Sequence, residues 1–280
     1  MMTAPTRPLV RYHGGKWKLA PWIIINFPQH KCYVEPFGGG GSVLIRKERS
    51  YAEVYNDLDG EIVNLFTVAM DQGEALAQLC EITPFERSEF ELSYSPASDS
   101  LEQARRTLVS SFMGFGSASV SHQISGFRAN SNRSGTTPAH DWINYPDALR
   151  ALIQRLRGVV IENRDAASCM KQHDAPTTLH YVDPPYVHDT RYLKNKTHTY
   201  RHEMTDADHE ALAESLHNLK GMVILSGYHC DLYDVLYKGW QRIERKAFAD
   251  GAKERTEVLW MNASVAEKFT AENAQRKMFA

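Results

Sequence analysis

The sequence has 280 residues, of which 42% are hydrophobic and 24% are charged, and its formal net charge is −2. This composition is ordinary for a globular protein, and the length allows one large domain or a domain with a substantial insertion. The apolar run at residues 22–27 is far too short to span a bilayer, and the start of the chain lacks the apolar core of a signal peptide. The cysteines are scattered without a C-x-x-C pair, which disfavours a disulfide framework or a zinc site and indicates a cytoplasmic protein.

The near-neutral total hides blocks of opposite charge. Residues 1–34 carry five basic residues and no acid, and residues 114–164 carry six arginines against three acids. Residues 71–104 instead carry eight acids against one arginine. Such blocks predict one face that binds a polyanion and another that faces away from it, although ordinary solvated faces would give the same pattern.

The first motif is Arg-Tyr-His-Gly-Gly-Lys at residues 11–16, which opens a helix-like stretch that runs to about residue 26. Two adjacent glycines let the backbone come close to a ligand, and Lys16 could meet a carboxylate there. The alternative is a helix start with a solvated lysine, which the motif taken by itself favours.

A strand at residues 33–37 is followed by the glycine turn 38–42 and a helix-like stretch at residues 43–48. This order is the first half of a nucleotide-binding βα unit. Val43 stands where the third glycine of a dinucleotide fingerprint would fall, and no Gly-Lys-Ser/Thr follows, so a dehydrogenase or an ATPase is disfavoured. A flexible glycine linker, the alternative, would not be flanked by a strand and an apolar helix.

A second strand, at residues 52–55, ends in Asn56-Asp57 and precedes a helix through residues 62–68. Asp57 stands eighteen residues after Gly39. That is near the offset of roughly 20 residues at which an acid reaches a ribose hydroxyl in a Rossmann-type unit. In isolation, Asp57 could equally be the N-cap of the helix that follows.

The middle of the chain has helical patterning at residues 74–79, 101–112 and 146–156, and a long polar loop fills residues 114–140. Arginine reads guanine and asparagine reads adenine in the major groove, so this loop could contact DNA; a disordered loop is the alternative. The candidate DNA-binding residues of the loop and of the later basic segment 187–203 are Arg128, Asn130, Asn132, Arg133, Lys194 and Lys196.

An apolar strand then ends in Asp183-Pro184-Pro185-Tyr186. Two adjacent prolines fix two φ angles and remove two N–H donors, so the turn is stiff and its free groups are acceptors. A planar group that carries an NH2 would suit it, with the hydrogens on the Asp183 carboxylate and the Pro184 carbonyl and the flat face on the Tyr186 ring. A plain surface turn is the alternative. Beyond it we expect a helix from Thr205 and strands at residues 222–226 and 257–262.

Four motifs follow one another in the chain: residues 11–16, the Phe-x-Gly-x-Gly at residues 37–41, Asn56-Asp57, and Asp183-Pro184-Pro185-Tyr186. In this order they resemble the motifs of the Dam-type, α-class DNA adenine-N6 methyltransferases, which use S-adenosylmethionine. The resemblance covers residues 8–70 and about 158–262. It implies a Rossmann-like α/β methyltransferase fold, with a mostly parallel sheet, helices on both faces and a smaller, largely helical insert. The catalytic domain would comprise residues 1–70 and 158–264, the target-recognition domain 71–157, and a polar tail 265–280.

The resemblance also implies residue roles. Lys16 would meet the methionine carboxylate of the cofactor, Asp57 the ribose hydroxyls, and Asp165 the adenine amine. The family commonly has Phe after that last acid, and Ala166 stands there in this sequence. The complete implied cofactor site is Tyr12, Lys16, Phe37, Gly39, Gly41, Ser42, Asp57, Asp165 and Asp183.

The implied reaction is methyl transfer to the N6 amine of adenine in double-stranded DNA, with the base flipped out of the stack and Tyr186 stacked on it. Asp183, Pro184, Pro185 and Tyr186 would be the catalytic residues, and no metal is needed. The implied host is a bacterium or a phage, and a cognate restriction endonuclease is left open as a second partner. Two alternatives remain: another planar amine (cytosine N4, an RNA base or a protein amide), or a DNA-binding protein with a decayed site. Asp183 favours adenine, because Ser or Asn more often replaces it in the other enzymes, and the intact motifs argue against decay.

Overall fold

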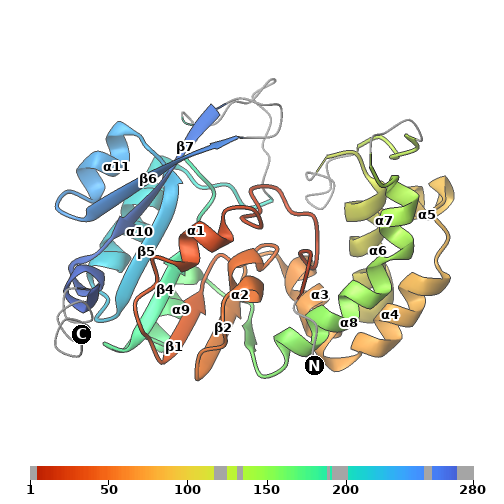
Figure 1. Cartoon of the computed structure of the whole chain (residues 1–280), viewed down its shortest axis with the longest axis horizontal. Coiled ribbons are helices and arrows are strands. Elements are labelled where there is room, and N and C mark those ends of the chain that lie inside the picture. The colour runs from red at the N-terminus through yellow and green to blue at the C-terminus, as the bar shows by residue number, and fades with distance from the viewer. Residues whose placement is uncertain are drawn as a thin grey trace.

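The computed structural model describes residues 5–116, 125–130, 135–187, 190, 201–248 and 254–269. Within them the chain is built on one seven-stranded sheet, in the order β3-β2-β1-β4-β5-β7-β6 (Figure 1). The strands are β1 (Cys32–Glu35), β2 (Ala52–Asn56), β3 (Val160–Glu162), β4 (Thr178–Val182), β5 (Met222–Tyr228), β6 (Gln241–Phe248) and β7 (Glu254–Met261).

The order of the strands predicts a crevice at the carboxyl ends of the central strands. Strands β1 to β5 run parallel, and β7 pairs antiparallel with both β5 and β6. The chain moves outward from β1 to β2 and β3, then returns to the other side of β1 to add β4 and β5. In α/β sheets, ligands bind at the carboxyl ends of the strands where the order reverses, here β1 and β4. The predicted α/β fold with a mostly parallel sheet is confirmed.

The sheet is buried on both faces. Successive residues of a strand point to opposite faces, and Ile224 and Leu259 join one hydrophobic cluster while Leu225 and Trp260 join another.

No helix in the described ranges is long and apolar enough to cross a membrane. The helices are α1 (Ala20–Ile24), α2 (Ser42–Arg46), α3 (Gly60–Asp71), α4 (Gly73–Ile82), α5 (Arg87–Leu92), α6 (Ser100–Met113), α7 (Pro138–Ile143), α8 (Tyr145–Leu156), α9 (Ala166–Gln172), α10 (Asp206–His217) and α11 (Asp231–Leu236).

Helices α4 to α8 gather beside the sheet, on the right of Figure 1. Helix α3 packs against α6, and α4 packs against α8. Their buried Leu76, Leu108 and Leu149 belong to the same hydrophobic cluster as Phe66 of α3. The described part of residues 71–157 is therefore largely helical and shares a continuous core with the sheet, while its role in target recognition stays a prediction.

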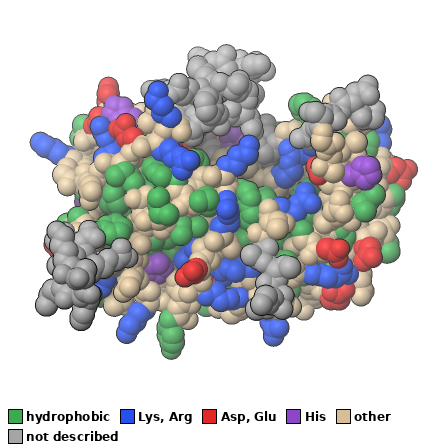
Figure 2. All heavy atoms as spheres, in the orientation of Figure 1, with side chains coloured by type: hydrophobic (Ala, Val, Ile, Leu, Met, Phe, Trp, Pro, Cys, Tyr) green, Lys and Arg blue, Asp and Glu red, His purple; other side chains and the backbone are tan. Residues whose placement is uncertain are grey.

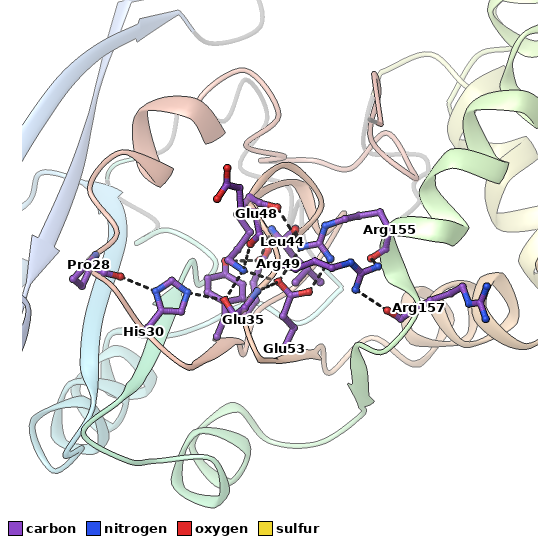
Figure 3. Close-up of polar contacts among 12 residues, drawn as sticks. Pro28, His30, Glu35, Leu44, Glu48, Arg49, Glu53, Arg155 and Arg157 are labelled. Carbon is purple, nitrogen blue, oxygen red and sulfur yellow. Dashed lines mark hydrogen bonds and ion pairs between the residues drawn. The ribbon is translucent and has the colours of Figure 1, made fainter. Parts of the chain in front are cut away.

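A seam of buried ion pairs joins α8 to β2 and to the end of α2 (Figure 3). We use the name seam for Lys47, Glu53 and Arg155, beside which lies the exposed Arg49. Arg155 donates to both carboxylate oxygens of Glu53, at 2.7 and 2.9 Å, and Lys47 Nζ lies 2.6 Å from Glu53 Oε1. Burial alone would raise the pKa of Glu53, but the bonds from Arg155 and Lys47 outweigh it and lower that pKa. Arg49 donates to the carbonyls of residues 154, 155 and 157 at the end of α8.

Arg155→Ala should therefore lower the free energy of unfolding by about 3–5 kcal/mol, because it removes one partner of a buried ion pair. The measurement is urea unfolding followed by circular dichroism. Arg150→Ala is the matched control, since Arg150 lies on the same helix but forms only exposed ion pairs with Glu74, Glu81 and Asp147 among the described residues. Equal losses for the two variants would show that the seam adds nothing beyond a surface pair.

Candidate active site

A cavity of about 370 Å³ opens where β1 and β4 end. It is therefore at the point where the topology predicts a ligand site. Most of the residues that the sequence assigned to a site line it, and Gly41 and Tyr186 lie just outside its lining. The predicted residues in the lining are Tyr12, Lys16, Phe37, Gly39, Ser42, Asp57, Asp165, Asp183, Pro184 and Pro185.

The glycine turn is shaped by the strand beside it. Gly39 and Gly41 have φ angles of 47° and 61°, a region that favours glycine, and Gly41 precedes the first residue of α2. The Gly39 N–H donates to Asp57 Oδ2 at 2.7 Å, and the Tyr55 hydroxyl donates to the Gly39 carbonyl at 2.7 Å. A Cβ on Gly39 would lie 2.9 Å from the Tyr12 ring. The turn thus brings bare backbone to the wall of the cavity.

Asp57 is not the cap of the next helix. Asp59 caps α3 by accepting from the Glu61 N–H at 3.0 Å, whereas Asp57 Oδ1 accepts from the Asp59 N–H at 2.8 Å. The N-cap alternative for Asp57 is therefore wrong. Burial raises the pKa of Asp57, and its two backbone hydrogen bonds oppose that rise. Asp165 lines the same cavity and caps α9, accepting from the Ser168 N–H at 2.9 Å.

Lys16 points into the protein. Its Nζ lies 2.9 Å from Asp183 Oδ1 and 4.6 Å from the centre of the Tyr186 ring, and it donates to the Gly14 carbonyl at 3.0 Å. Lys16 is only 7% exposed, so the alternative of a solvated lysine is wrong. The prediction that Lys16 meets a cofactor carboxylate stays a prediction. The contact between Lys16 and Asp183 joins the first and last motifs of the chain.

Within the described residues, Asp183 is hydrogen-bonded through Oδ1. Lys16 and the Ser226 hydroxyl, which donates at 2.6 Å, both bind Asp183 Oδ1. Asp183 Oδ2 accepts no hydrogen bond from the described residues, and Asp183 lines the cavity. Pro184 and Tyr186 are buried, so the plain surface turn is excluded. The turn presents an acceptor to the cavity.

Comparison with known proteins supports what this geometry indicates. A family model described as D12 class N6 adenine-specific DNA methyltransferase matches residues 12–250. The chain belongs to this family. The predicted resemblance to adenine-N6 methyltransferases is thereby confirmed.

Two curated relatives match shorter stretches. A protein of Haemophilus influenzae named DNA adenine methylase is 29% identical over 76 residues, which cover 27% of this chain and 26% of that protein. A DNA adenine methylase of Serratia marcescens is 31% identical over 62 residues, which cover 22% of this chain and 23% of the relative. The matches thus span about a quarter of the length of these relatives.

Glu35 also lines the cavity, and it was not predicted from the sequence as a site residue. It ends β1, is 3% exposed, and accepts from the Tyr33 hydroxyl at 2.7 Å and the Leu44 N–H at 2.9 Å. Burial raises the pKa of Glu35 to about 8. The available signal was its place directly before Pro36 and the glycine turn, where a strand-end acid faces the crevice.

Glu35→Gln should flatten the pH dependence of stability. The folded pKa lies above the ordinary value of 4.5, so the folded protein holds this proton more tightly than the unfolded chain. The contribution is complete below about pH 4.5 and is lost as the pH rises through about 8, a change of at most about 5 kcal/mol. Urea unfolding at several pH values measures it, with the exposed Glu48→Gln as control. An unchanged slope in Glu35→Gln would contradict the raised pKa.

Residues 201–204 are bound to the start of α3 through the Arg201 side chain. Arg201 Nη1 lies 2.8 Å from Asp59 Oδ1, and Arg201 Nη2 lies 3.0 Å from Glu61 Oε1. Residues 201–204 line the cavity as a result. Arg201 was not predicted as a site residue, because nothing local in the sequence links it to Asp59 and Glu61. The predicted Lys194 and Lys196 lie outside the described residues.

The described part of the polar loop forms a short antiparallel pairing at the end of α6. Gly114 bridges Phe127, and the Arg128 side chain donates to the Phe112 carbonyl at 3.0 Å. Asn130 is exposed, and Phe115, which was not predicted as a site residue, is 71% exposed. Asn132 and Arg133 lie outside the described residues. Lys and Arg side chains spread across the middle of the face in Figure 2, between the sheet and helices α4 to α8.

Proposed function

We propose that this protein transfers a methyl group from S-adenosylmethionine to the N6 amine of adenine in double-stranded DNA. The observation that carries the proposal is the Asp183-Pro184-Pro185-Tyr186 turn at the cavity, where Asp183 Oδ2 accepts no hydrogen bond from the described residues. Family membership supports the same reaction, and the relatives named DNA adenine methylase agree with it.

The residues present fit S-adenosylmethionine, which supplies an electrophilic methyl group on a sulfonium. The cavity volume of about 370 Å³ lies in the range of about 300–1,000 Å³ that is typical of small-molecule sites. Asp57 would hold the ribose hydroxyls, and the glycine turn would lie beneath the ribose and methionine. Phe37 and Tyr12 add apolar surface to the lining. Asp165 would accept from the adenine amine of the cofactor.

Asp183 and Pro184 would orient the amine that is methylated. An exocyclic amine is a poor nucleophile, because its lone pair is delocalised into the ring. With one hydrogen on Asp183 Oδ2 and the other on the Pro184 carbonyl, the lone pair turns toward the cofactor. The carboxylate also stabilises the positive charge that develops on nitrogen. Alignment of the reacting atoms supplies most of the acceleration, for which about 7–11 kcal/mol is attainable.

The target base would have to leave the duplex, at a cost of a few kcal/mol. Tyr186 would stack on it. Since Lys16 lies over one face of the Tyr186 ring, the base takes the opposite face or displaces Lys16. Exposed Phe115, next to the polar groups of the loop, suits contact with unstacked bases, while Arg128 and Asn130 suit contact with base edges or phosphates.

Single-molecule sequencing of DNA from cells that express the protein tests the proposal. The host strain should lack adenine methylation of its own. N6-methyladenine at a defined sequence is the expected result, absent with Asp183→Asn. Methylation of cytosine N4 alone, or no modification by a folded wild-type protein, would overturn the assignment.

A further inference from the structure

Glu257 lies outside every motif of the sequence analysis, yet it reaches the active site. It is on β7, opposite Tyr228 of β5, and is 3% exposed. It stands two positions before Leu259, so both point to the same face of the sheet. A buried acid in the interior of a sheet needs a reason, because burying a charge is costly unless it is paired.

The partners of Glu257 are two residues of the proposed site. The Tyr186 hydroxyl donates to Glu257 Oε1, and Lys16 Nζ lies 3.9 Å from the same oxygen. Lys16 Nζ is also 2.9 Å from Asp183 Oδ1. The Tyr228 and Tyr186 rings pack in a T-shaped arrangement, with their centres 4.7 Å apart.

We propose that Glu257 is a positioning residue for methyl transfer, which fixes the Tyr186 ring through its hydroxyl and shares the Lys16 ammonium with Asp183. The inference rests on the roles proposed above for Asp183 and Tyr186. It adds a residue from the antiparallel end of the sheet to a site otherwise built by the parallel strands.

Two physical consequences follow from the cluster. A tyrosine ring held at its hydroxyl cannot tilt freely, so the surface offered to the flipped base is set before binding. One ammonium shared by two carboxylates leaves the cluster with a net negative charge when both are ionised. Asp183 then keeps charge with which to hold an amine that becomes positive.

A purely structural role fits the contacts less well. Among the described residues, Glu257 accepts one hydrogen bond and has one ion-pair partner at the limit of contact. Burial raises the pKa of Glu257, and the Lys16 ammonium and the Tyr186 hydroxyl counteract that rise. A neutral side chain of similar size would fill the same space at less cost. A buried carboxylate whose pKa is shifted by burial and by a specific charged neighbour is typical of functional sites.

The test is a set of variants assayed in single turnover at saturating DNA and S-adenosylmethionine. Glu257→Leu removes the charge and the acceptor, Glu257→Gln keeps an acceptor oxygen, and Tyr186→Phe removes the hydroxyl. Glu244→Gln, an exposed acid on neighbouring β6, is the matched control. Cofactor affinity is measured separately by calorimetry, and folding by circular dichroism.

Glu257→Leu should slow transfer by about a hundredfold, Glu257→Gln should slow it less, and both should leave cofactor affinity within about twofold. Tyr186→Phe should cost about tenfold alone and little more when added to Glu257→Leu, because both remove one hydrogen bond. Transfer within about threefold of wild type in folded Glu257→Leu, or losses that multiply in the double variant, would overturn the inference. Should Glu257→Leu not fold, wild-type rates in both Glu257→Gln and Tyr186→Phe would overturn it.

Asp183→Asn separates this inference from the proposed function. An inactive Asp183→Asn beside normal Glu257 variants overturns the role of Glu257 alone. An active Asp183→Asn overturns the role proposed for Asp183, whereas a folded wild-type protein that makes no N6-methyladenine overturns the proposed function itself.

Discussion

Asp183→Ala should lower methyl transfer to duplex DNA by more than about a thousandfold while the protein stays folded. Loss of one preorganised acceptor costs about 2.7–4 kcal/mol in comparable sites. Asp183 would also orient the nucleophile, so the two losses combine. Its Oδ2 accepts no hydrogen bond from the described residues, which leaves it for this task. Tritiated methyl transfer at saturating cofactor and DNA measures the effect.

The Asp183→Ala variant should still fold, although the truncation removes the acid nearest to Lys16. Lys16 keeps the Gly14 carbonyl at 3.0 Å and Glu257 at 3.9 Å, so the ammonium is not stranded. Asp183→Asn is the matched variant, since it keeps the shape and an acceptor for Ser226. Circular dichroism checks that both are folded. A folded Asp183→Ala protein with near-normal turnover would sink the mechanism.

The sequence predicted those parts of the fold whose signals are local. The strand that ends at Asn56 and the strand that ends at Val182 lie at their predicted places, and the strand predicted at residues 33–37 is present as β1, two residues shorter at its end. Each combines an apolar run with turn residues directly after it. The predicted helix up to residue 26 is shorter: α1 covers Ala20–Ile24, and Phe27 is disfavoured in a helix because Pro28 follows.

Edge strand β6 was missed because its pattern is charged. Its residues Arg242, Glu244, Arg245 and Lys246 are exposed, so the strand lacks the apolar alternation that identifies a buried one. The pairing with β7 holds it in place through backbone hydrogen bonds. A strand is predicted from the alternation of buried and exposed side chains, and an edge strand with exposed charged side chains lacks that alternation.

Contacts within the site were harder to predict, because they join distant parts of the chain. The sequence brought Lys16 and Asp183 into one site, but not into contact, and it gave no indication of Glu257. Only the assembled sheet brings β7 next to the turn that follows β4. Asp57 and Asp59 show the same limit at short range: both suit a cap, and the backbone geometry decides that Asp59 is the one.

Asp57→Ala should weaken S-adenosylmethionine binding by at least about a hundredfold. Hydrogen bonds to a charged group contribute about 1.5–3 kcal/mol each, and the carboxylate would accept from two ribose hydroxyls. It also holds the glycine turn, since its two oxygens accept from the Gly39 and Asp59 N–H groups at 2.7 and 2.8 Å. Removal therefore costs both the contact and the shape of the turn.

Asp57→Asn distinguishes charge from shape and should not rescue binding. An amide has one acceptor oxygen, so its NH2 group would face one of the two backbone N–H groups donor to donor. Calorimetric titration with S-adenosylmethionine measures the affinity, and Asp71→Asn, an exposed acid at the other end of α3, is the control. Wild-type affinity in Asp57→Ala would remove Asp57 from the cofactor site. Wild-type affinity in Asp57→Asn alone would mean that the turn keeps its shape with a single acceptor.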